Sequence, residues 1–201
     1  LHMTPVAMVI NVLNSALILW ALWPQGAHGF LLVWALAING LAALGLRGWL
    51  KGRRRPPAGS VSPRALRRAA VQATVLGGLW AVLPAVLLPR LDAPAQFLLS
   101  MVTTGMICAG GFALASLPVA ATSYVLAIGL GGLVALAQWP TDLAGIVTAL
   151  LALYVAVVVF SVWTHARTLG ARLMAEARAD RNNEVIGLLL RDFEDHASDL
   201  L

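Results

Sequence analysis

Charged residues are scarce in this chain. Asp, Glu, Lys and Arg make up 11% of its 201 residues, whereas a soluble globular domain carries about 25%. Hydrophobic residues reach 60%, and the mean hydropathy is +0.83. This composition excludes a water-soluble globular domain and indicates a polytopic membrane protein, for which lipid is part of the solvent.

Asp, Glu, Lys and Arg are missing from the interiors of the apolar segments. Ion-coupled carriers and pumps place such groups inside the membrane, because they move charge across it. The absence argues against an ion-coupled transporter and leaves a passive pore or a carrier of neutral solutes open. Cys108 is the single cysteine, which excludes an intrachain disulfide and a cysteine-rich metal site.

Recognisable catalytic and metal-binding motifs are also lacking. The histidines at 28, 165 and 196 are far apart in the predicted topology, so each is interpreted as a structural or solvated side chain. No zinc-binding spacing, phosphate-binding glycine loop, nucleophile elbow or spaced carboxylate pair occurs. We therefore expect no enzyme activity, no metal and no cofactor in this chain.

Six apolar segments are long enough to cross a bilayer, for which a helix needs about 20 residues. Most of the turns between them contain proline, which ends a helix. The segments run from 6 to 23, 28 to 46, 69 to 88, 95 to 117, 119 to 138 and 143 to 163. We predict an all-α bundle of six transmembrane helices over residues 4–163. Residues 1–3 are interpreted as a cloning remnant, and residues 164–201 as a cytoplasmic linker helix.

The basic residues of the first 163 positions are concentrated in one connection. Eight Arg or Lys lie between Arg47 and Arg68, while the other connections hold only Arg90, Asp92 and Asp142. Positive loops stay in the cytoplasm, so we predict a long cytoplasmic loop from Arg47 to Arg68 and both chain ends in the cytoplasm. Arginines beside apolar segments are typical topology signals, so we expect no nucleic-acid partner.

Aromatic residues are few, at 7%, and most tryptophans lie near predicted segment ends. An amphipathic ring favours the headgroup region of a bilayer. We interpret five tryptophans as interface anchors: Trp20, Trp23, Trp49, Trp139 and Trp163.

Polar side chains that enter the predicted membrane region are the candidate contact or ligand residues. Asn11 and Asn14 are three residues apart and share one helix face. Such groups bond neighbouring helices or line a small ligand pocket, and the sequence leaves both readings open. The full set is Asn11, Asn14, Asn39, Thr103, Thr104 and Tyr124.

The fourth apolar segment carries a stripe of small residues. Gly105, Ala109 and Ala113 recur every four residues, beside Gly110 and Gly111. Small residues let helix backbones approach closely in lipid. The stripe predicts helix packing inside the bundle, or alternatively a dimer seam or a ligand-responsive contact.

The composition changes after residue 163 to a polar stretch that is rich in helix formers. Its apolar residues recur at helical spacing and form a face that needs a partner. We interpret the following residues as a signal helix: Leu169, Leu173, Ile186, Leu189, Leu190 and Phe193. We infer that the chain is a fragment of a longer protein with a further cytoplasmic part.

Two stretches resemble the membrane-embedded N-terminal sensor regions of bacterial signalling proteins. They are TGMICAGGFALASLPVAA at 104–121, followed by Tyr124, and RNNEVIGLLLRDFEDHASD at 181–199, which is similar to the helix leading into a PAS domain. In those proteins the region precedes PAS and then GGDEF or GGDEF-EAL domains, which make or degrade cyclic di-GMP; similar regions precede histidine kinases or nucleotide cyclases. The chain departs from the family by ending at Leu201 without the aromatic-rich strand that follows there.

The resemblance implies an input and anchoring module in the bacterial inner membrane. It further implies a homodimer, because such output domains act in pairs, and signalling domains in the same chain. The sensed molecule is open, and a small hydrophobic ligand is allowed. Two alternatives stay beside the sensor: a small channel or carrier for a neutral or lipophilic solute, and a purely structural anchor.

Overall fold

The computed structural model describes residues 3–53, 63–138 and 142–198, and the regular elements within these ranges are all helical. Two short 3-10 helices are η1 (Trp23–Gln25) and η2 (Leu88–Arg90). The α-helices are α1 (Met3–Leu22), α2 (His28–Arg53), α3 (Pro63–Leu87), α4 (Ala93–Ala113), α5 (Pro118–Ala137) and α6 (Ala144–Ser198). Each of the six is long and apolar enough to cross a membrane. The predicted all-α architecture with six helices of spanning length is confirmed.

The chain divides into two compact units, Leu1–Trp163 and Thr164–Leu201. The division falls where the composition changes from apolar to polar. The first unit contains α1 to α5 and the part of α6 up to Trp163, and the second contains the rest of α6. The cytoplasmic location of the second unit stays a prediction.

Turn chemistry fixes the connections between the helices. Gly26 adopts a φ of +83°, which side chains disfavour, and its N–H donates to the Trp23 carbonyl over 3.3 Å to close η1. Asp92 caps α4, because its carboxylate accepts a hydrogen bond from the Ala95 N–H over 3.0 Å. Prolines stand in the first turns of η1, η2, α4 and α5, where a missing N–H has little effect. These devices hold successive helices in tight hairpins.

The helices flanking the basic connection are longer than the hydropathy predicts. A loop was expected from Arg47 to Arg68, but α2 continues to Arg53 and α3 begins at Pro63. The predicted loop is therefore wrong over most of its length, and its core at 54–62 lies outside the described residues. The physical reason is that Arg, Lys, Leu and Ala are good helix formers, and long basic side chains extend toward the headgroups from a helix end.

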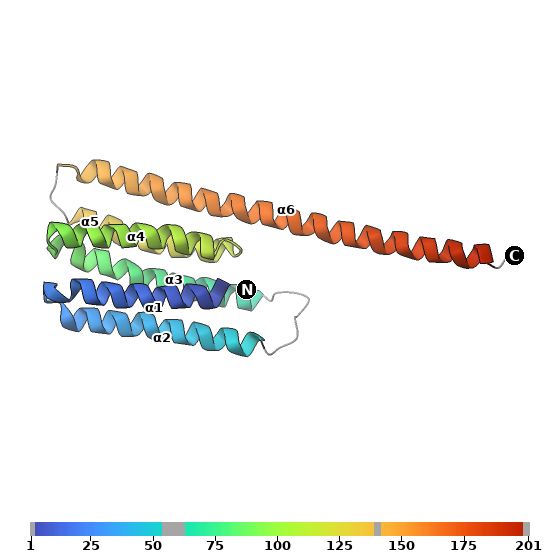
Figure 1. Ribbon diagram of the computed structural model, residues 1–201. Helices are drawn as coiled ribbons and strands as arrows, with labels where there is room; N and C mark the ends of the chain where they lie inside the picture. The colour runs from blue at the N-terminus through green and yellow to red at the C-terminus, as the bar shows by residue number, and fades with distance from the viewer. Residues whose placement is uncertain (1–2, 54–62, 139–141, 199–201) are drawn as a thin grey trace. The chain divides into compact units, whose positions relative to one another are not determined.

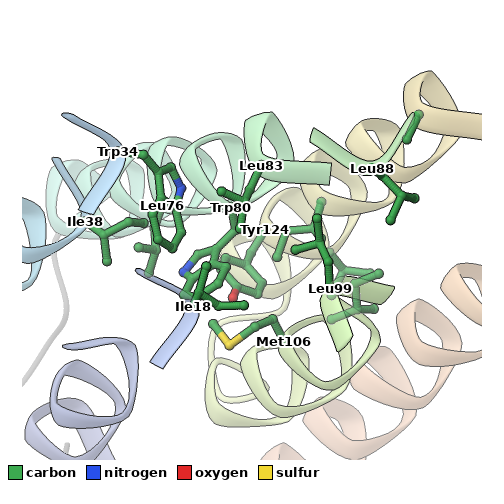
Figure 2. Close-up of a cluster of buried hydrophobic side chains, with 14 of the residues drawn as sticks. Ile18, Trp34, Ile38, Leu76, Trp80, Leu83, Leu88, Leu99, Met106 and Tyr124 are labelled. Atoms are coloured by element: carbon green, nitrogen blue, oxygen red, sulfur yellow. The ribbon is translucent and has the colours of Figure 1, made fainter. Parts of the chain in front are cut away.

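The first unit is built around the contact between α3 and α5. Around this pair, α1 packs against α2 and α4, α2 against α3, and α4 against α5. Helices that follow one another in the chain run in alternating directions, so α3 and α5 run the same way (Figure 1). Their shared core is apolar, and Figure 2 shows part of it. Its largest fully buried side chains include Tyr124, Ile18, Leu31, Ile38, Leu83, Leu99 and Ile107.

The outer surface of the bundle is apolar as well. Leu36 is 71% exposed and Phe160 is 72% exposed. Val33, Leu130 and Leu150 also point outward. A soluble protein rarely exposes such a continuous apolar surface, so this outer layer supports a multi-pass membrane protein.

Candidate functional site

Asn11 lies in the core and joins α1 to α3. Its side-chain oxygen accepts a hydrogen bond from the Trp80 indole N–H over 2.8 Å, and its amide donates to the Ala7 carbonyl, also over 2.8 Å. The side chain is only 6% exposed. Because a buried polar group needs a partner, Asn11 and Trp80 satisfy each other and fix the two helices in register.

Asn39 and Asn14 connect further helices. The Asn39 amide donates to the Ser15 hydroxyl over 3.1 Å and to the Ala35 carbonyl over 2.7 Å, which joins α2 to α1. The Asn14 amide contacts the Met106 sulfur at 3.2 Å, a weak acceptor on α4. All three asparagines therefore lie at helix contacts.

Trp34 and Trp80 belong to the same cluster, although sequence reasoning did not select them. Their rings meet edge to face, with centroids 5.1 Å apart and an interplanar angle of 83°. The Trp34 indole also donates to the Leu79 carbonyl over 2.7 Å. Both tryptophans lie in the middle of apolar segments, whereas interface anchors lie at the ends. This position in the sequence could have indicated that they are buried.

Tyr124 fills the space between α3, α4 and α5 and is 1% exposed. A Cβ at Gly110 would overlap its ring, and a Cβ at Gly77 would lie 2.7 Å from its carbonyl oxygen. At Gly111 an added Cβ would lie 3.0 Å from a methyl group of Val158 on α6. Three glycines therefore bring neighbouring helices into close contact around Tyr124 and α4.

The rest of the small-residue stripe points outward. An added Cβ at Gly105 would meet no atom within 4 Å. The other members of the stripe, Ala109 and Ala113, are exposed too. Among the described residues these three positions therefore lie on an exposed face, and their packing against another helix or a second copy stays a prediction.

A pocket of about 270 Å³ lies between α3, α4, α5 and the first part of α6. Pro84 and Leu88 line it from the α3 side, and Gly132 and Leu136 from α5. Its polar wall consists of Ser100, Thr103 and Thr104 of α4 and Tyr154 of α6. Val147, Leu150 and Leu151 complete the α6 side. Four helices thus line one cavity of the apolar unit, which is partly open to the outside because Leu150 is 59% exposed.

Hydrogen bonds organise the polar wall of this pocket. The Tyr154 hydroxyl donates to the Thr104 carbonyl over 3.0 Å and ties α6 to α4. The Thr103 hydroxyl donates to the Leu99 carbonyl over 2.7 Å. Both hydroxyl oxygens can still accept a hydrogen bond from a ligand. The pocket suits a small, mostly apolar molecule that carries a neutral polar group, since no ionisable carboxylate, amine or guanidinium lines it.

The pocket contains only part of the predicted ligand set. Thr103 and Thr104 line it, whereas the three asparagines and Tyr124 are not among its lining residues. Tyr154 and the glycine at 132 were missed, because hydropathy does not show which helices meet. Of the predicted polar residues, Thr103 and Thr104 therefore line the pocket, whereas the three asparagines and Tyr124 lie at contacts between helices.

The predicted signal helix is described in part. Leu169 is 36% exposed and Ile186 is 54% exposed. The side chains of Leu173, Leu189, Leu190 and Phe193 lie outside the described ones.

Metal chemistry has no support in the described residues, which contain no group of three His, Cys, Asp or Glu able to hold an ion. His28 is engaged locally: its ring nitrogen lies 2.9 Å from the Trp23 carbonyl oxygen, and the centroids of the His28 and Trp23 rings are 4.3 Å apart.

Comparison of the chain with protein-family models, curated proteins and solved structures gave no match.

Proposed function

We propose that this chain is a membrane-embedded sensory and anchoring domain that passes a signal through α6 to a cytoplasmic output. One observation carries the proposal. The pocket wall includes Leu150 and Tyr154, and the helix that bears them continues without a break to Ser198. A ligand in the pocket therefore contacts the same helix that leads to the chain's C-terminal unit.

The attachment of α6 favours a helix that can shift. On α5, Gly129 and Gly132 face the side-chain tips of Val155 and Leu151 of α6, so side chains separate the two backbones. A second, fully apolar groove of about 530 Å³ follows the α5–α6 contact. Space beside a helix allows it to take a second position with little repacking of the remaining bundle.

The proposed mechanism is a population shift. A molecule that binds the pocket more tightly in one position of α6 increases the fraction of chains in that position. The ligand class follows from the lining: an uncharged molecule with one hydroxyl or other neutral hydrogen-bond donor near Thr103 and Tyr154, whose own hydroxyl protons are already donated. Resemblance to bacterial sensor regions supports cyclic di-GMP synthesis or degradation as the output, in a homodimer at the inner membrane.

The test introduces a large side chain into the pocket, where it takes the place of a ligand. The chain is fused at its C-terminal end to a diguanylate cyclase domain, and cyclic di-GMP production is compared for Thr104→Phe and Met101→Phe. Met101 is 61% exposed on the same helix and does not line the pocket. We expect the Thr104 variant to change output by about fivefold, a typical coupling between sites. Equal output from both variants would contradict the sensor function.

A carrier of a neutral solute is the second candidate, because the same pocket lies within spanning helices and lacks charged groups. Solute uptake into vesicles that contain only this chain is the test. Flux that Thr104→Phe abolishes and Met101→Phe preserves would favour the carrier. Absence of flux, together with a changed output in the fusion, would favour the sensor.

The homodimer needs its own test. Leu169 is partly exposed in the second unit, beyond the sixth span predicted to end at residue 163. A Leu169→Cys chain with Cys108→Ala should form a disulfide-linked dimer in native membranes under mild oxidation. A monomer at all oxidant concentrations would rule out close pairing of α6 at this position.

A further inference from the structure

A third cavity lies at the basic end of the bundle, away from the pocket between α3, α4, α5 and α6. It is a groove of about 570 Å³ between α2 and α3. The residues that line it are Leu41, Arg64, Arg67, Arg68, Val71, Gln72 and Val75. One end of the groove is therefore cationic, and the rest is mainly apolar.

Within the described part of the first unit, the three arginines have few carboxylates to offset their positive charge. Within residues 1–163 the only carboxylates are Asp92 and Asp142. Asp92 caps α4 beside the other end of α3. The 25 residues of α3 span about 37 Å at 1.5 Å per residue, so Asp92 lies far from the three guanidinium groups. The groove is suited to an anion.

The lining residues that α3 contributes to the groove share one face of the helix. Arg64, Arg67 and Arg68 lie three and four residues apart and share one face of the helix. Val71 and Val75 continue that face by the same spacing, and they are 55% and 48% exposed. A single face of α3 thus changes from cationic at the helix end to apolar toward the middle of the span.

We propose that this groove binds an anionic phospholipid. Its phosphate would pair with the arginine side chains, whose planar guanidinium groups bind phosphate in bidentate geometry. One acyl chain would lie along Val71 and Val75 toward Leu41. Basic clefts between membrane helices are common sites for acidic lipid headgroups. A topology signal alone needs positive charge in the connection, but it does not need an apolar track that continues from the arginines.

The experiment measures lipid retained by the whole chain after purification in detergent, where membrane orientation plays no part. Phosphatidylglycerol and phosphatidylcholine with identical acyl chains are added in equal amounts, and native mass spectrometry counts the bound lipids. We expect at least a tenfold preference for phosphatidylglycerol. No preference between the two lipids would overturn the proposal.

Two triple variants distinguish binding in the groove from attraction by overall charge. Arg64→Gln with Arg67→Gln and Arg68→Gln should reduce phosphatidylglycerol retention by about tenfold or more. The matched control removes three exposed arginines of the second unit, through Arg167→Gln, Arg172→Gln and Arg178→Gln, and should retain the lipid. An equal loss in the control would show attraction by overall charge only, which would overturn the proposal.

Two further variants test phosphate geometry and the acyl track. Arg64→Lys with Arg67→Lys and Arg68→Lys keeps the charge and should weaken retention several-fold, because ammonium groups do not bind phosphate in bidentate geometry. Val75→Phe fills the exposed track, leaves every charge in place and should also weaken retention. Full retention by the Val75 variant, or displacement of the lipid by millimolar inorganic phosphate, would show a site for a free anion and would overturn the lipid assignment.

Discussion

The contact of α3 with α5 and the contact of α5 with α6 are built differently. At Gly131 a Cβ would overlap the backbone of Ala81, so the first contact brings two backbones together. At Gly129 and Gly132 an added Cβ would meet only the side-chain tips of Val155 and Leu151, at 2.9 and 2.8 Å. A backbone contact cannot adjust, whereas the Leu151 side chain can change rotamer, although the β-branched Val155 is stiffer. The bundle therefore combines a fixed centre with one helix that is held more loosely.

The largest expected effect comes from breaking the fixed centre. Gly131→Ala and Gly77→Ala each force α3 and α5 apart, and each should destabilise the bundle by about 3 kcal/mol, the upper part of the range for overpacking. Gly78 is the matched control, since an added Cβ there meets nothing within 4 Å. Gly78→Ala should change stability by less than about 1 kcal/mol. Unfolding by sodium dodecyl sulfate in mixed micelles measures all three, and similar values would refute the backbone contact.

An intermediate effect is expected where α1 is bonded to the centre. Asn11→Leu leaves the buried Trp80 N–H without its acceptor and should reduce stability by about 1 kcal/mol, within the range for hydrogen bonds between membrane helices. A double-mutant cycle with Trp80→Phe isolates the bond. Its coupling energy should lie near 0.6 to about 1.7 kcal/mol. Additive single effects would show that the bond does not stabilise the fold.

The smallest effect on stability should come from loosening α6. Tyr154→Phe removes the hydrogen bond to the Thr104 carbonyl and should reduce stability by only about 0.6 kcal/mol. It should nevertheless broaden the distance distribution between spin labels placed on α4 and α6. Leu153→Ala, at a position 62% exposed on α6, serves as the control. An unchanged distribution would mean that this bond does not restrain the helix.

The helices were predictable from the sequence, but their partners were not. Segment length and proline turns locate six helices, because the bilayer sets the length of a span. Charged helix ends such as that of α2 at Arg53 are ambiguous, since the same residues suit a helix or a loop. The asparagines could be recognised as contact residues, while Trp80 as the partner of Asn11 depends on a register that periodicity does not give.

The glycines show the same limit more clearly. A four-residue spacing in α4 predicted close packing, yet Gly105 faces outward and the closest backbone approach occurs at Gly131 of α5. The spacing of small residues along a sequence identifies a helix face that allows close packing, but it does not identify the helix that packs against it. The pocket was beyond sequence reasoning for the same reason, since its wall joins Pro84, Thr104 and Tyr154 from three separate helices.

The asparagine bonds also set an order of assembly during synthesis. The Asn39–Ser15 bond closes within the α1–α2 hairpin, so that pair can enter the membrane together with this bond already formed. Asn11 must wait for Trp80, which is 69 residues later in the chain. At 5–20 residues per second that delay is roughly 3 to 14 s. During this interval the hairpin carries an unpaired amide oxygen, which gives a ribosome-bound intermediate a defined point for contact with an insertion factor or for premature pairing with another chain.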